Sequence, residues 1–228
     1  LPTLPLYHYF LLDIIEVKTF IPMIQTQTQP VSFEQFCQWY PEDGKRYELI
    51  EGEIIEMLPT GIHEDISGFL VAELNLEIRR CQLPYSIPRT CLIKPSQPRS
   101  GYQPDVTVVN RNFIKNEPQW EQRSVLQNVE TIPLVIEVVS TNWRDDYGHK
   151  FIEYEAMGIP EYWIVDYRGL GGIRFLGKPK QPTVTVCQLV AGEYQTQCFR
   201  SNQFLKSNIF PDLQLSTDSI FNAGEEDK

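Results

Sequence analysis

The sequence lacks long apolar runs, paired cysteines and an excess of basic residues, and each absence argues against a class of protein. No apolar run reaches the roughly 18 residues that a membrane-spanning helix needs, so we expect no membrane association. The five cysteines are scattered without a CxxC pair, which disfavours zinc and disulfide frameworks and favours a reduced, cytoplasmic protein. The formal net charge of -10 argues against indiscriminate binding to polyphosphate.

The composition that is present is typical of a globular protein. With 228 residues, of which 42% are hydrophobic, the chain can bury a sizeable core. We expect a folded domain over residues 30–222, an extension or linker over residues 1–29 and an acidic tail over residues 223–228. Residues 1–22 resemble a signal peptide poorly, because Asp13 and Glu16 interrupt the apolar part. We interpret them as an extension or as the product of an upstream start.

The first half of the chain alternates between helical and strand patterns. Ser32 and Gln35 have the capping-box spacing before a short helix, FEQFCQWY. Alternating apolar and acidic residues in YELIEGEIIEM predict a hairpin that turns at Glu51-Gly52. Later patterns predict a helix over residues 62–78 and strands in SIPRTCLIK and PDVTVV.

The second half predicts a strand–helix–strand unit followed by shorter strands. The apolar run LVIEVVS reads as a strand buried on both faces. Asp145 or Asp146 is expected to cap the next helix, and the strand EYWIVD then returns by a crossover that implies parallel neighbours. Antiparallel strands are expected in IRFLG, TVTVCQLV and EYQTQCFR. Residues 204–221 are expected to pack back against the folded domain. The expected fold is α/β (α+β), with a central mixed sheet flanked by helices.

The carboxylate of Glu137 is the first sign of chemistry, because it interrupts an apolar strand. Burying an unpaired carboxylate costs several kcal/mol, so Glu137 needs a cation, a donor or a raised pKa. A structural ion pair with Lys150 or Arg144 is the simpler explanation. The alternative is a metal site: Asp105 opens the strand PDVTVV, and adjacent strands would let both acids bind a hard cation such as Mg²⁺. Such an ion could orient water and stabilise charge on a phosphoryl group.

The ordered series of motifs resembles a known family. In chain order the motifs are YELIEGEIIEM, His63, QPDVTVV, LVIEVVS, a helix with Lys150 and Tyr154, GIPEYWIVD and IFPDLQL. This series resembles the bacterial restriction endonucleases often called Uma-two, within the PD-(D/E)XK nucleases. The resemblance covers roughly residues 30–222 and implies a restriction-endonuclease-like core. It also implies that Asp105 and Glu137 are ligands of Mg²⁺, or of Mn²⁺. The remaining implied roles are a catalytic lysine at Lys150, an auxiliary acid at Glu48 and site-lining residues at His63 and Ser140.

One position departs from the family pattern. The strict motif has its lysine two residues after the glutamate, where this sequence has Val139. Lys150 must therefore act from the following helix.

Three functions are compatible with these features. The first is a Mg²⁺-dependent endonuclease acting on DNA, for which a homodimer or higher homo-oligomer is expected because two sites can cut two strands. The second is a noncatalytic interaction or nucleic-acid-binding module. The third, a glycoside hydrolase with Asp105 and Glu137 as acid and base, gives Lys150 no role. Candidate DNA-contacting cations are Arg79, Arg80, Arg89, Lys94, Arg99, Arg168, Arg174, Lys178 and Lys180.

Overall fold

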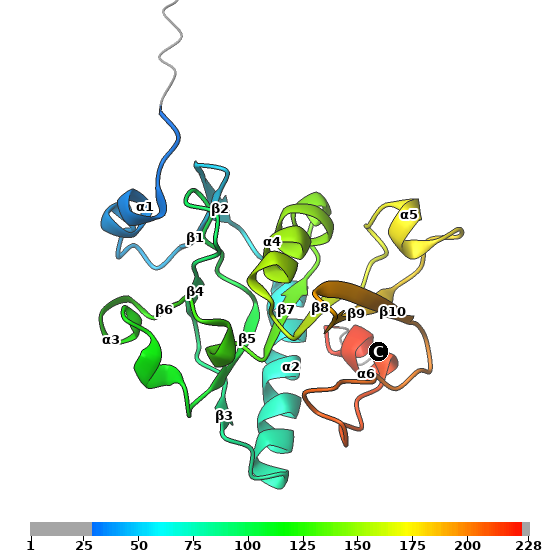
Figure 1. Ribbon diagram of the computed structural model, residues 1–228. Helices are drawn as coiled ribbons and strands as arrows, with labels where there is room; N and C mark the ends of the chain where they lie inside the picture. The colour runs from blue at the N-terminus through cyan, green and yellow to red at the C-terminus, as the bar shows by residue number, and fades with distance from the viewer. Residues whose placement is uncertain (1–28, 225–228) are drawn as a thin grey trace, which may run out of the picture.

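A computed structural model describes residues 29–224, which build a central mixed sheet with helices on both faces (Figure 1). The strands are β1 (Arg46–Ile50), β2 (Glu53–Met57), β3 (Tyr85–Ser86), β4 (Leu92–Ile93), β5 (Val106–Asn110), β6 (Val125–Leu126), β7 (Leu134–Val138), β8 (Glu161–Asp166), β9 (Thr183–Val190) and β10 (Glu193–Phe199). The helices are α1 (Phe33–Trp39), α2 (Gly61–Arg80), α3 (Trp120–Arg123), α4 (Lys150–Met157), α5 (Ile173–Leu176) and α6 (Thr217–Asn222). A π-helical turn, Asp145–His149, leads into α4.

The main sheet has six strands in the order β10-β9-β8-β7-β5-β3. Strands β7 and β8 are parallel, and the other neighbours in this sheet are antiparallel. An antiparallel hairpin, β1-β2, and a parallel pair, β4-β6, form two smaller sheets. The predicted crossover unit between β7 and β8 and the mixed sheet are therefore confirmed.

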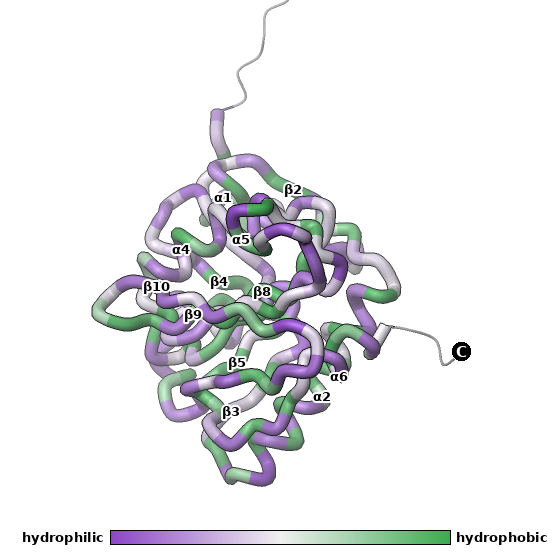
Figure 2. The backbone as a smooth tube through the Cα atoms, turned by 90° about the vertical axis from the view of Figure 1, so that its right-hand side faces the viewer, coloured by the Kyte–Doolittle hydropathy of each residue, from purple (hydrophilic) through white to green (hydrophobic). Residues whose placement is uncertain are grey.

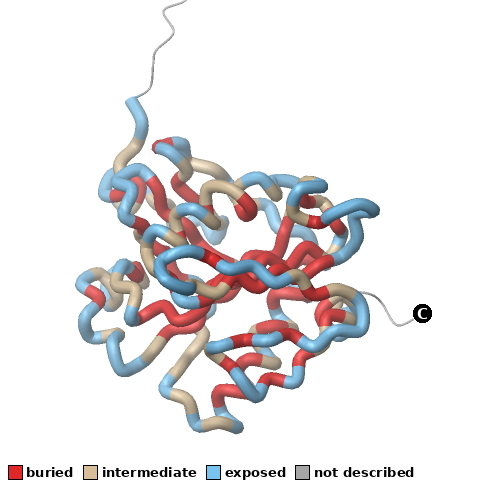
Figure 3. Tube along the Cα trace, turned by 45° about the vertical axis from the view of Figure 1, so that its right-hand side comes forward, coloured by how far each residue is buried: buried red, intermediate tan, exposed pale blue. Residues whose placement is uncertain are grey.

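Each face of the main sheet is covered by a different helix. Alternate residues of β7, such as Ile136, pack with Leu70 and its neighbours on α2, whereas Val135 packs with Tyr154 on α4. Helix α6 lies beside α2 (Figure 1 and Figure 2) and adds Ile220 to the same apolar cluster. Figure 3 shows that the buried residues follow the central strands, with exposed segments around them. Both faces of β7 are buried, as its apolar run predicts.

Local sequence signals account for the N-terminal elements. The capping box at α1 is formed, because Gln35 N–H donates to Ser32 Oγ at 3.2 Å and Ser32 N–H donates to Gln35 Oε1 at 2.8 Å. The β1-β2 hairpin turns through Glu51 and Gly52, both at positive φ, which is the conformation that two-residue hairpin loops favour. Helix α2 begins after Thr60, whose side chain accepts a hydrogen bond from His63 N–H.

Three sequence predictions about local structure are wrong. SIPRTCLIK splits between β3 and β4, which belong to different sheets. IRFLG forms the helix α5 instead of a strand, and its Phe175 ring stacks on Tyr147 at 4.6 Å between ring centroids. Neither Asp145 nor Asp146 caps a helix, because both lie inside the π-helical turn. The tail does pack back, through α6.

The prediction for residues 1–22 concerns a segment outside the described residues. No helix among residues 29–224 combines the length and apolar character needed to cross a membrane.

Candidate active site

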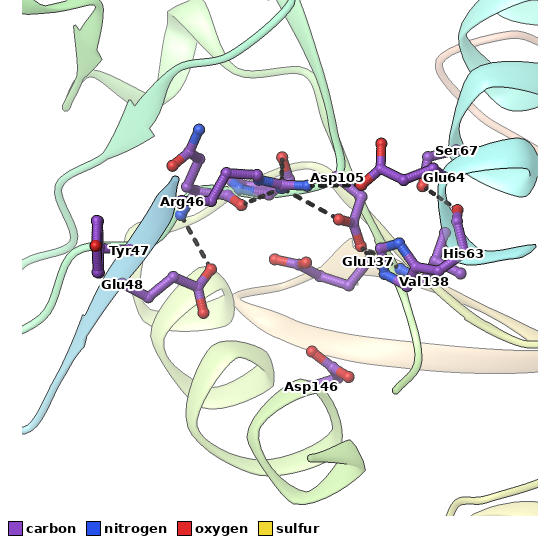
Figure 4. Close-up of polar contacts among 12 residues, drawn as sticks. Arg46, Tyr47, Glu48, His63, Glu64, Ser67, Asp105, Glu137, Val138 and Asp146 are labelled. Carbon is purple, nitrogen blue, oxygen red and sulfur yellow. Dashed lines mark hydrogen bonds and ion pairs between the residues drawn. The ribbon is translucent and has the colours of Figure 1, made fainter. Parts of the chain in front are cut away.

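Asp105 and Glu137 meet at one end of two neighbouring strands. The β5-β7 register pairs Val106 with Ile136, and one further step places Asp105, which directly precedes β5, opposite Glu137. Opposed residues of an antiparallel pair project to the same face of the sheet. The close-up in Figure 4 shows the two carboxyl groups near one another. The structure thus brings together the two acids that the sequence singles out.

The ammonium group of Lys150 lies inside a cluster of three carboxylates. Its Nζ is 3.1 Å from Glu48 Oε1, 3.2 Å from Glu137 Oε1 and 3.4 Å from Asp146 Oδ1. Tyr154, one turn further along α4, donates its hydroxyl to the same Glu137 oxygen at 3.0 Å. The Lys150 side chain is only 2% exposed. Strands β1 and β7 and the start of α4 therefore converge on one buried cation.

Burial and mutual repulsion control the charges in this cluster. Burial raises the pKa of Glu137 well above its usual value, and the neighbouring carboxylates add to the rise although Lys150 opposes it. Burial also raises the pKa of Glu48 and raises the pKa of Asp146 to about 7. Burial alone would lower the pKa of Lys150, but the surrounding carboxylates outweigh it and raise that pKa well above its usual value. Three acids share one permanent cation, so the cluster holds more potential negative charge than it can balance.

Asp105 has a different set of partners. Its Oδ1 accepts a hydrogen bond from Arg46 Nη2 at 3.2 Å, and its Oδ2 accepts one from Val138 N–H at 2.8 Å (Figure 4). The same Oδ2 lies 3.2 Å from His63 Nε2. Burial alone would raise the pKa of Asp105, but the contacts with His63 and Arg46 outweigh it and lower the pKa. Asp105 is therefore held as a carboxylate.

A cleft of about 240 Å³ opens beside Asp105. His63 and Ser140 line it, as the family resemblance implies, and so does Val139, the residue at the usual lysine position. The other walls come from the β2-α2 connection and the loop after β8, and the lining residues with charged side chains are Arg46, Glu56, His63, Asp105 and Arg168. Of the nine basic residues proposed from sequence for DNA contact, Arg168 is the one that lines this cleft.

Sequence reasoning missed two residues of the site, Arg46 and Asp146. Arg46 stands two residues before Glu48 on β1, so both side chains project to the same side of that strand. Asp146 precedes Lys150 by four residues, a spacing at which helical side chains meet. These spacings were the available signals, but each also describes an ordinary surface pair.

Glu161 is a second buried carboxylate, and its surroundings differ from those of Glu137. It lies on β8, fully buried, and accepts hydrogen bonds from Trp163 Nε1 at 2.7 Å and Asn208 N–H at 2.7 Å, as well as from Gln188 and Ser207. Its oxygens are thus satisfied by neutral donors. Glu137 instead shares a cation with two other acids, an arrangement found in active sites and also in structural ion-pair networks.

The central mixed sheet flanked by helices is the restriction-endonuclease-like fold expected from the sequence. A family model described as "Uma2: Putative restriction endonuclease" matches residues 33–218. The chain belongs to this family. The family resemblance and the fold class expected from the sequence are therefore confirmed.

A solved structure supports the same fold. The chain is similar to a protein from Anabaena variabilis ATCC 29413 described as "a putative nuclease belonging to DUF820", with 20% sequence identity and a TM-score of 0.64. The match covers 86% of this chain and 99% of that chain. No curated protein matches the chain.

Proposed function

We propose that this protein is a metal-dependent endonuclease that hydrolyses phosphodiester bonds of DNA. The observation that carries the proposal is the convergence of Asp105, Glu137 and the buried ammonium of Lys150 at the end of two neighbouring strands. Family membership supports a nuclease, and the cleft beside Asp105 supplies access for a substrate.

The residues of the site fit a hard divalent cation such as Mg²⁺ or Mn²⁺. Within residues 29–224 no three His, Cys, Asp or Glu side chains are grouped as a ligand set, so these residues alone supply at most a partial set. Mg²⁺ is commonly held by one or two carboxylates together with water and substrate phosphate. Asp105 and Glu137 would hold the ion, and the excess of acids around Lys150 favours an added positive charge. The chemistry supplied by such an ion is Lewis-acid stabilisation of charge on phosphorus-bound oxygen and activation of water.

The chain itself contributes two fixed cations close to these acids. Lys150 places its ammonium 3.2 Å from Glu137, where it can stabilise negative charge that develops on the phosphoryl group. Arg46 lines the cleft with a partly exposed guanidinium that also holds Asp105. Both cations are positioned before a substrate binds, so little reorganisation is needed during the reaction.

The proposal is tested by incubating supercoiled and linear DNA with the full chain and increasing Mg²⁺ or Mn²⁺. We expect cleavage that depends on the metal and disappears with a chelator. A preparation that gives no cleavage at saturating concentrations of either ion, while remaining folded, would contradict the proposal.

Arg168 is expected to contact the phosphate backbone from the far wall of the cleft. In a Glu137→Gln background that prevents cleavage, Arg168→Gln should weaken binding to different duplex sequences alike. The slope of log affinity against log salt should fall by about 1, because one phosphate contact is lost. Fluorescence anisotropy over a salt series measures this, with Arg111→Gln as the matched control because Arg111 is exposed, lies outside the cleft lining and is not among the nine candidate DNA contacts. An unchanged slope for Arg168→Gln would argue against DNA in this cleft.

A noncatalytic module is the second candidate, and two observations favour it. The ion pairs of Lys150 would persist without any catalysis, and Val139 occupies the usual lysine position. A module of this kind would bind DNA or a partner without metal-dependent cleavage.

For the enzyme, we also propose a homodimer in which edge strand β10 offers the contact. Sedimentation analysis of the full chain would test this.

A further inference from the structure

The π-helical turn before α4 is a distinctive backbone feature at the edge of the site. It spans Asp145–His149, and Lys150 N–H donates to the carbonyl of Asp145, five residues back. The hydroxyl of Tyr162 on β8 donates to the backbone carbonyl of Asp146 at 3.0 Å, which ties the turn to the sheet. Most π-helices are single turns of this kind, and they are frequent at functional sites.

This turn directs the side chain of Asp146 inward. Asp146 is buried, and its Oδ1 lies 3.4 Å from Lys150 Nζ. Its neighbour Asp145 has a partly exposed side chain, 3.3 Å from His149 Nδ1. Two consecutive aspartates on one turn thus have separate partners, one inside the site and one at the surface.

Asp146 is the third carboxylate around the ammonium group of Lys150. Glu48 and Glu137 approach Lys150 from strands β1 and β7, whereas Asp146 comes from the same helical segment as the lysine. A lysine side chain has four flexible carbon–carbon bonds, so one or two contacts leave it several rotamers. A third contact from its own segment fixes the side chain relative to the helix that carries it.

We propose that Asp146 is a positioning residue for Lys150, whose carboxylate holds the ammonium beside Glu137 from the π-helical turn. The catalytic part of this inference rests on the proposed function, because it requires that Lys150 takes part in hydrolysis. The structural part, the ordering of Lys150 by Asp146, does not depend on nuclease activity.

The structural part is tested by chemical acetylation of the folded protein, with the rate at each lysine measured by mass spectrometry. Lys150 should react slowly in the wild type because it is buried, and faster in Asp146→Asn. Asp145→Asn is the matched control, since it removes a charge from the same turn without touching Lys150, and should leave the rate unchanged. Lys178 is exposed and serves as an internal standard for each variant. Equal rates at Lys150 in Asp146→Asn and the wild type would overturn the inference.

The catalytic part is tested by a double-mutant cycle on kcat. Asp146→Asn should lower kcat by roughly tenfold to a hundredfold, as expected when a catalytic group loses its position, with KM little changed. In a Lys150→Met background, Asp146→Asn should cause no further loss, because the group it positions is gone. Additive losses would overturn the inference, as would unchanged Mn²⁺-dependent kcat in Asp146→Asn.

Two outcomes separate this inference from the proposed function. If the wild type does not cleave DNA but Asp146→Asn exposes Lys150, the nuclease proposal fails and the ordering role is supported. If calorimetry shows that Asp146→Asn loses Mn²⁺ affinity while Lys150 stays protected, Asp146 is a ligand and the positioning role is wrong.

Discussion

Replacing Glu137 with glutamine should remove DNA cleavage without destabilising the protein. A fall in kcat of about a hundredfold or more is expected, the size seen when one group that stabilises transition-state charge is lost. The free energy of unfolding should be unchanged or higher, because burial and neighbouring acids raise the pKa of Glu137 and make its charge costly in the folded state. Lys150 keeps its contacts with Glu48 and Asp146. Single-turnover cleavage and urea denaturation measure the two effects.

Glu161→Gln is the matched control because it changes another buried carboxylate on the adjacent strand β8. Glutamine cannot accept with both of its terminal atoms, so at least one buried donor among the partners of Glu161 is left unpaired. The expected cost is about 1–3 kcal/mol of stability, with cleavage unchanged below the melting transition. If Glu137→Gln behaves like Glu161→Gln, losing stability and retaining activity, Glu137 is structural and the active-site assignment is wrong.

The core of the site could be predicted because its residues break a local pattern. A carboxylate within the run LVIEVVS has no place in a buried strand unless it is paired, and Glu137 is indeed buried beside Lys150. Asp105 could be predicted from its position at the start of the strand PDVTVV. The register of β5 and β7 places it opposite Glu137. These inferences needed only strand geometry and the cost of burying charge.

The remaining features depend on tertiary contacts that short sequence patterns do not encode. The four helical residues of IRFLG are too few to distinguish alternation from a helical repeat, and aromatic packing of Phe175 on Tyr147 accompanies the helix. The π-helical turn is tied down by Tyr162, a residue sixteen positions away in sequence from Asp146. The sequence does not reveal this turn, and in the sequence alone the pair Asp145-Asp146 has the pattern of an ordinary helix cap.

Lys150→Met should cause the largest loss of stability among these variants and lower kcat by about a hundredfold or more, which leaves a residual rate that single-turnover assays can measure. The substitution keeps an unbranched side chain one heavy atom shorter but leaves Glu48, Glu137 and Asp146 buried together without their cation. Removing one partner of a buried ion pair costs about 3–5 kcal/mol, because the remaining charge is uncompensated. Urea denaturation at neutral pH measures the loss. Lys94→Met, which breaks the more exposed pair with Glu34, should cost about 1 kcal/mol or less and provides the control.

Moving the lysine to the strand separates loss of charge from loss of the helix position. Val139 follows Glu137 by two residues, so its side chain projects to the same face of β7, and it lines the cleft. In a Lys150→Met background, Val139→Lys should restore part of the stability and part of the cleavage, because an ammonium group again stands near Glu137. Val139→Met in the same background tests for an effect of side-chain size alone and should restore neither. If Val139→Lys recovers nothing, the site requires an ammonium delivered from α4, and the position of Lys150 is as important as its charge.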